Sequence, residues 1–242
     1  MNDIETIENN KNNFLPGQGS NSQEAAQRLQ DIGSSILRAA RDELYLGMRF
    51  LDVALSSFIY QMDGSVSPFG TDGAVMYFHP AQLGGLYKEN RILVNRGYLH
   101  MVFHCIFRHF WGKPGIEKRL WNLSCDIAVE HMIDGIYHRS VRYSRSLLRR
   151  ETYRLLEKEK KTLNAERIYK ILKEEFLKEK ELAQLEKEFY VDDHKYWANQ
   201  QPDRKPNPLM SKNGEISAKE LRQIWRPFPE GQESRTEIFW TS

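Results

Sequence analysis

The chain has 242 residues, of which 40% are hydrophobic, with 35 Lys and Arg against 33 Asp and Glu. This length allows one domain or two small ones, and the nearly balanced charge excludes a global attraction to nucleic acid. The two cysteines exclude a disulfide-stapled secreted scaffold. No apolar run reaches the roughly 18 residues of a membrane-spanning helix, and the acidic, Asn-rich N-terminus lacks the features of a signal peptide. We therefore expect a cytoplasmic protein that binds neither nucleic acid nor membrane.

The N-terminal third is expected to be helical with one short strand. Residues 1–22 are polar and rich in Asn, Gly and Gln, which is typical of a disordered arm. From residue 22 to residue 61 apolar side chains recur every three or four positions, which predicts a buried helical stripe that Gly33 or Gly47 would divide. A β-prone run over residues 74–79 follows. Because a proline stops this run, we expect it to be an edge strand.

The rest of the chain is expected to be helical as well. Residues 92–110 are rich in Leu, Val, Phe and Ile, which predicts a core-buried helix, and residues 118–137 predict the next. We expect Trp121 and the apolar face of the first of these helices at the centre of the core. Residues 139–189 alternate Lys with Glu around regularly spaced apolar residues, the pattern of exposed helices with salt bridges. Residues 202–213 have the composition of a linker.

These elements predict a mainly helical α+β fold with a small sheet. A disordered arm (1–22) would precede a core of residues 23–137. A charged helical extension (138–200) would pack outside that core. A linker and the start of a truncated C-terminal region (201–242) would follow.

A pair of histidines is the most informative feature. His100 and His104 are four residues apart on the expected helix, so both imidazoles point the same way and can reach one ion. In a zinc peptidase the residue after the first histidine is a glutamate that activates the metal-bound water. Here that position is Met101, whose thioether cannot take a proton. Two core histidines spaced by chance are the alternative.

The next helix supplies carboxylates. Asp126 and Glu130 are also four residues apart, and Asp126 follows His104 by 22 residues across a Gly/Pro loop that lets the helices lie side by side. Two histidines and a neighbouring carboxylate are the ligand set of a catalytic zinc site with one open position. The alternative is that both carboxylates are surface charges, paired with Arg119 or Arg139.

His109 is a weaker candidate. It follows His100 by nine residues, which places it on roughly the opposite side of an unbroken helix. That position favours a residue behind the metal site, at the helix end or in ordinary packing over a third ligand.

Several stretches between residues 25 and 240 resemble one known family. They are Thr71-Asp72-Gly73, Tyr77-Phe78-His79-Pro80, Leu99-His100 to His109, Trp121-Asn122 with Cys125-Asp126, and Asp192-Asp193-His194 with Trp197. In this order they resemble the "putative metallopeptidase domain" at the N-terminus of bacterial von Willebrand factor A-like (VWA-like) proteins, a zincin-related family. The family favours Asn-Pro where this chain has His79-Pro80.

The resemblance implies a zincin-like core over residues 23–137 and a bound zinc ion. The implied zinc ligands are His100, His104 and Asp126. The family normally has Glu where this chain has Met101, which implies that peptide hydrolysis is weak or lost. Glu130 stands where the family often has Asn, and we consider it as a substitute base.

A peptide or protein partner is expected in either case. A peptide would bind along the 74–79 strand by strand addition, which makes Tyr77 and Phe78 candidate substrate-binding residues. The alternative is a non-catalytic interaction module whose charged helices (139–190) dock a MoxR-type AAA+ ATPase, since family members are commonly encoded beside such ATPases. The family also continues into a VWA-like domain, so we expect this chain to be truncated or to lack that half.

Overall fold

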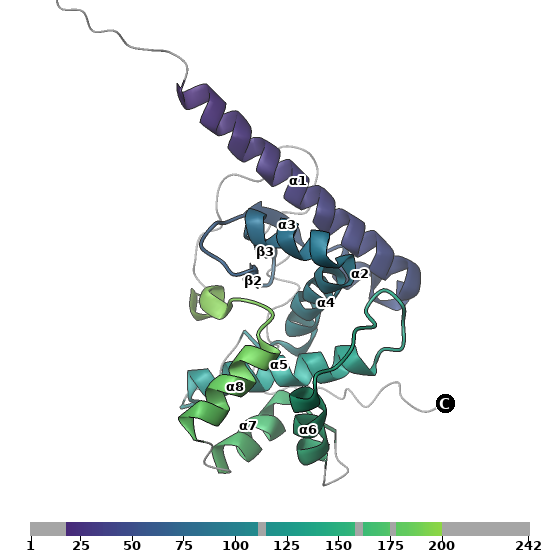
Figure 1. The fold of residues 1–242 in the computed structure, drawn as a ribbon, viewed down its shortest axis with the longest axis vertical. Coiled ribbons are helices and arrows are strands. Elements are labelled where there is room, and N and C mark those ends of the chain that lie inside the picture. The colour runs from purple at the N-terminus through teal and green to yellow at the C-terminus, as the bar shows by residue number, and fades with distance from the viewer. Residues whose placement is uncertain (1–17, 111–114, 158–161, 175–177, 200–242) are drawn as a thin grey trace, which may run out of the picture.

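The computed structural model describes residues 18–110, 115–157, 162–174 and 178–199 (Figure 1). The first half contains helices and three short strands: α1 (Gln18–Gly47), η1 (Arg49–Leu51), α2 (Asp52–Leu55), β1 (Ile59–Met62), β2 (Phe69–Thr71), β3 (Val75–Phe78), α3 (Pro80–Glu89) and α4 (Arg91–Phe107). The second half is helical: α5 (Lys118–Gly135), α6 (Leu147–Leu156), α7 (Ala165–Glu174), α8 (Glu179–Phe189) and η3 (His194–Asn199). The expected fold class, mainly helical α+β with a small sheet, is confirmed.

The strand expected over 74–79 is present as β3, but it is not an edge strand. The strand order is β1-β3-β2, with β1 parallel and β2 antiparallel to β3. The expectation failed because Ile59–Met62, assigned by periodicity to a helix, forms β1 instead. A short apolar run fits a helix or a strand equally well. Since both edges of β3 are paired, a peptide cannot be added along it.

A first hydrophobic cluster joins α1, α4 and the sheet. Two glycines allow the close approach, because a Cβ on Gly33 of α1 would lie 2.1 Å from the Phe78 ring and one on Gly97 of α4 would lie 2.3 Å from the Phe69 ring. Gly33 therefore does not divide α1, which continues to Gly47. The Phe78 side chain is fully buried in this cluster.

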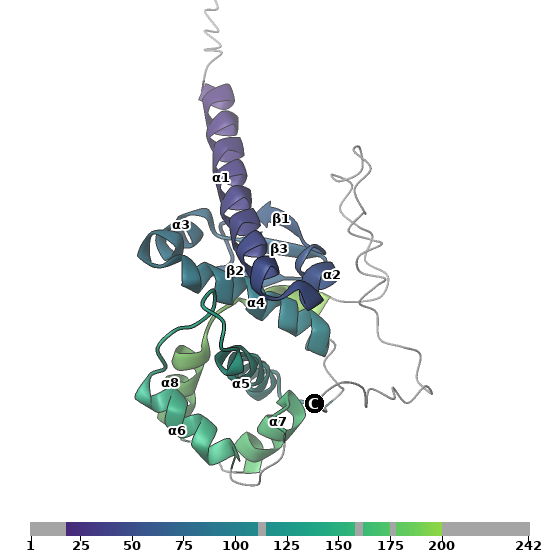
Figure 2. The ribbon, with the colours of Figure 1, turned by 90° about the vertical axis from the view of Figure 1, so that its right-hand side faces the viewer.

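A second cluster is built around α5. Figure 2 shows α6, α7 and α8 arranged around this helix, and their apolar stripes bury Trp121 together with residues such as Ile168 and Phe189. Trp121 therefore belongs to this cluster and not, as expected, to the centre formed by the apolar face of α4. The regularly spaced apolar residues of the extension thus form the buried faces of amphipathic helices, which pack on α5 and share a hydrophobic cluster with it.

Helix α4 lies between the two halves and contacts α1, α3, β2 and α5. It is buried along residues 94–105, which places the histidine pair in the middle of the molecule.

Both ends of the chain, residues 1–17 and 200–242, lie outside the described residues. Helix α1 begins at Gln18, so residues 18–22 of the expected arm are helical, while residues 1–17 and the expected linker at 202–213 lie outside the described residues. Within the described ranges no helix is both long and apolar enough to cross a membrane.

Candidate metal centre

His100 and His104 are completely buried on neighbouring turns of α4, with ring centroids 4.4 Å apart. A buried imidazole nitrogen without a partner costs free energy, so such atoms normally find one. The Nε2 atoms of both histidines nevertheless lack a hydrogen-bond partner. The two unpartnered nitrogens therefore mark a place where a ligand is expected.

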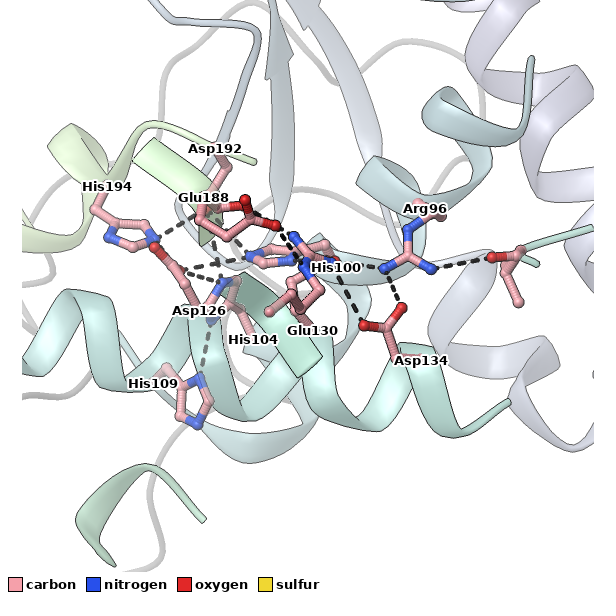
Figure 3. Close-up of polar contacts among 12 residues, drawn as sticks. Arg96, His100, His104, His109, Asp126, Glu130, Asp134, Glu188, Asp192 and His194 are labelled. Atoms are coloured by element: carbon pink, nitrogen blue, oxygen red, sulfur yellow. Dashed lines mark hydrogen bonds and ion pairs between the residues drawn. The ribbon is translucent and has the colours of Figure 1, made fainter. Parts of the chain in front are cut away.

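Two carboxylates face these nitrogens (Figure 3). Asp126 of α5 places Oδ1 3.6 Å from His100 Nε2 and 3.4 Å from His104 Nε2. Asp192, just after α8, places Oδ1 3.4 Å from His100 Nε2 and 3.7 Å from His104 Nε2. One potential ligand atom from each of the four residues lies within 4.8 Å of all the others.

These four residues fit a divalent metal ion. Zinc–nitrogen bonds of 2.0–2.1 Å place neighbouring ligands of a tetrahedral site about 3.3–3.4 Å apart, close to the spacing seen here. Asp126 Oδ1 and both oxygens of Asp192 also lack hydrogen-bond partners although they are buried. A cation between them would satisfy the orphaned atoms and neutralise two carboxylates that are costly to bury.

His194 lies beside the same carboxylates. Its Nε2 is 3.0 Å from Asp126 Oδ1 and 2.9 Å from Asp192 Oδ1, but neither contact has the geometry of a hydrogen bond. The His194 ring stacks on the Trp197 ring, with the ring centroids 3.7 Å apart. Burial would lower the pKa of His194, but the two carboxylates outweigh burial and raise this pKa to about 10. At neutral pH His194 is therefore a cation that faces both aspartates.

His100 and His104 differ in protonation. Burial lowers the pKa of His100, yet Asp126, Asp192 and Glu130 together hold it well above its usual value. Burial and the neighbouring charge of His100 lower the pKa of His104 to about 4. His104 is thus neutral at neutral pH, the form in which an imidazole binds a metal.

Glu130 holds His100 from behind. His100 Nδ1 donates to Glu130 Oε1 over 2.8 Å, so that Nε2 faces the centre and carries the lone pair when the ring is neutral. Glu130 Oε2 accepts from Arg96 at 2.5 Å and from Arg149 at 2.6 Å. Burial would raise the pKa of Glu130, but His100 and the two guanidiniums hold it well below its usual value. Both oxygens of this carboxylate are engaged on the side of His100 away from the ligand atoms.

His109 supports His104 in a similar way. Helix α4 ends at Phe107, before the expected residue 110, and Arg108 adopts a left-handed conformation with φ 60°. The chain turns back, so that His109 Nδ1 lies 2.9 Å from His104 Nδ1 and not on the opposite side of the helix. Burial lowers the pKa of His109, which keeps it neutral and able to accept a hydrogen bond from His104 Nδ1. That bond again leaves Nε2 of His104 for the centre.

A family model described as "Putative metallopeptidase domain" matches residues 34–236. The chain belongs to this family. No curated protein and no solved structure matches it.

In this domain of the metallopeptidase family, the side chain of Met101, which stands at the position of the usual base, lies in the hydrophobic core. Met101 is fully buried in the first hydrophobic cluster, among side chains such as Leu37 and Leu99. A carboxylate at this position would enter an apolar environment.

Asp192 and His194 belong to a segment that is tied to the sheet of the domain. The Asp193 N–H donates to the Phe69 carbonyl over 2.7 Å, and Lys195 lies 3.2 Å from Asp63. Tyr196 stacks on Tyr77 with centroids 3.9 Å apart. Tyr77 therefore supports the segment that carries Asp192.

The motif Asp192-Asp193-His194 is part of the family resemblance, but no spacing in the sequence predicts that it lies at the candidate metal centre. Asp192 follows Asp126 by 66 residues, a separation that carries no spacing signal. Helical periodicity places two residues on one face of one helix, but it cannot say which distant segment packs there. The cluster Asp-Asp-His before a tryptophan was the available clue.

The centre is reached from a surface cavity of about 510 Å³. Its lining includes Asn122 and Asp126 of α5, together with Tyr190, Asp192 and His194. The lining thus includes the two aspartates and His194, while His100 and His104 lie behind it.

Proposed function

We propose that this domain binds a zinc ion through His100, His104 and Asp126, with Asp192 as the fourth ligand. The observation that carries the proposal is the buried convergence of two imidazole nitrogens and two aspartates whose facing atoms make no hydrogen bond. Two imidazoles and carboxylate oxygens are a donor set that zinc accepts. A zinc ion that keeps an open position can polarise a substrate carbonyl and lower the pKa of a coordinated water.

We further propose that peptide hydrolysis is weak or lost. A catalytic zinc site has three protein ligands and one open position, whereas a fourth protein ligand closes a structural site. Asp192 and His194 lie where the open position would be needed. Met101 cannot act as a base, and loss of a general base typically costs about 10²–10⁴-fold in rate. Glu130, which is held by His100, Arg96 and Arg149, acts in this proposal as a positioning residue for His100.

The test is the metal content of the purified protein by elemental analysis. We expect close to one zinc ion per chain in the unchanged protein and its loss in His104→Ala. His131→Ala is the matched control, since this histidine pairs with Glu157 on the surface and should leave the zinc in place. A folded unchanged protein that takes up no zinc, or zinc retained in His104→Ala, would contradict the proposal.

A further inference from the structure

The connection between α5 and α6 is strongly basic although the whole chain is nearly balanced. Residues 136–150, which form this connection and the first turn of α6, contain five arginines and no Asp or Glu, and they include exposed aromatic side chains. Tyr137 is 93% exposed and Tyr143 is 46% exposed. Arginine and tyrosine are the residue types that protein–protein interfaces favour.

This connection is held in place by buried contacts with α4. Asn95 Nδ2 donates to the Ser140 carbonyl over 2.9 Å, and Arg96 donates to the Val141 carbonyl over 3.0 Å. Val141 itself is fully buried. The arginines of this connection therefore project from a fixed backbone, so less conformational entropy is lost when a partner binds.

A cavity of about 460 Å³ lies between this connection, the end of α5 and one face of α6. Its lining carries the guanidiniums of Arg145, Arg150 and Arg154, with Arg150 and Arg154 one turn apart on α6. Among the described residues that line it, the single carboxylate is Glu157, which is held by His131 at 2.7 Å. Arg145 itself lies 3.7 Å from the Asp134 carboxylate, so the excess of positive charge in the cavity is carried by Arg150 and Arg154.

Two of these arginines can accept a new partner at little cost. Arg154 pairs with Glu151 one turn away, but both side chains are exposed, and such a pair contributes only about 0–1 kcal/mol. Arg150 is exposed at the start of α6. Guanidinium groups bind carboxylates with two parallel hydrogen bonds, which gives both affinity and orientation.

We propose that this cavity, formed by Arg145, Arg150 and Arg154, docks an acidic peptide segment of a partner protein. A peptide fits better than nucleic acid because Glu151 and Glu157 interrupt the basic surface along α6, whereas a phosphate backbone requires a continuous basic track. The exposed tyrosines beside the arginines supply the apolar contacts of a protein interface. The proposal does not depend on the metal centre.

The experiment uses a fluorescein-labelled peptide with six consecutive glutamates and a glutamine peptide of the same length, with binding followed by fluorescence anisotropy. We expect the glutamate peptide alone to bind the full chain. Arg150→Glu with Arg154→Glu should weaken this binding at least tenfold. Lys180→Glu with Lys187→Glu is the matched control, because it changes the charge equally on exposed positions of α8 and should change binding less than twofold.

Arg150→Gln with Arg154→Gln covers the case in which charge reversal unfolds α6, and it should also weaken binding. Binding should survive His104→Ala. No binding of the glutamate peptide, equal loss in the α8 control, or tighter binding of a thymidine 20-mer at the same arginines would each overturn the proposal.

Discussion

Replacing Glu130 by Gln tests whether the residues behind the histidines determine metal affinity. The substitution keeps the side-chain shape but removes the negative charge of the carboxylate, which accepts hydrogen bonds from His100, Arg96 and Arg149. Loss of a group that orients a metal-binding histidine typically weakens metal affinity about 10–100-fold, which corresponds to about 1.4–2.7 kcal/mol.

The same substitution should also lower the free energy of unfolding. Removing one partner of a buried ion pair typically costs about 3–5 kcal/mol. Arg96 keeps Asp134 at 2.8 Å and Arg149 keeps Glu188 at 3.2 Å, so we expect the lower end of that range. Urea denaturation measures this loss.

The assay is competition for zinc with a chromophoric chelator, on protein shown to be folded by circular dichroism. Glu179→Gln is the control, because this carboxylate also binds an arginine, Arg119, at 2.7 Å but lies on the surface. We expect unchanged zinc affinity in Glu179→Gln. If Glu130→Gln binds zinc as tightly as the unchanged protein, Glu130 does not orient His100 and the reasoning is refuted.

Three further outcomes are expected. Zinc at 100 times its Kd should stabilise the fold by about 2.7 kcal/mol and raise the Tm by roughly 5–11 °C. Differential scanning fluorimetry measures this rise in Tm, which should be absent in His104→Ala. Met101→Glu should destabilise the chain without producing peptide cleavage, since the carboxylate enters an apolar cluster; cleavage by a stable variant would contradict this. Gly33→Ala should lower the free energy of unfolding by about 1–3 kcal/mol, because the added methyl group overpacks against Phe78. Gly85→Ala, whose methyl group would meet nothing within 4 Å, should not destabilise the chain, and urea titration of both variants measures the difference.

The sequence allowed the α4 and α5 part of the site to be predicted, because that part depends on local spacing. His100 and His104 share a face through the helical repeat, and Asp126 reaches them because a short connection lets α4 and α5 pack together. The structure brings these three residues together as expected. Their role as ligands stays a prediction.

The rest of the site and of the fold depends on contacts between segments whose packing the spacing of residues in the sequence does not determine. Asp192 reaches the centre only because the segment after α8 pairs with the sheet at Phe69. The position of β3 in the middle of the sheet depends on β1, whose four residues also fit a helical period. His109 was misplaced because one left-handed residue, Arg108, ends α4 early and reverses the chain. The cytoplasmic location and the MoxR-type ATPase partner stay predictions.

The most direct test is an anomalous difference map, collected at the zinc absorption edge from crystals grown with zinc. We expect one strong peak about 2.0–2.2 Å from Nε2 of His100, Nε2 of His104 and the Asp126 carboxylate, with Asp192 on its fourth side. The absence of a peak between α4 and α5 in a zinc-containing crystal, or a peak only at surface residues, would contradict the account.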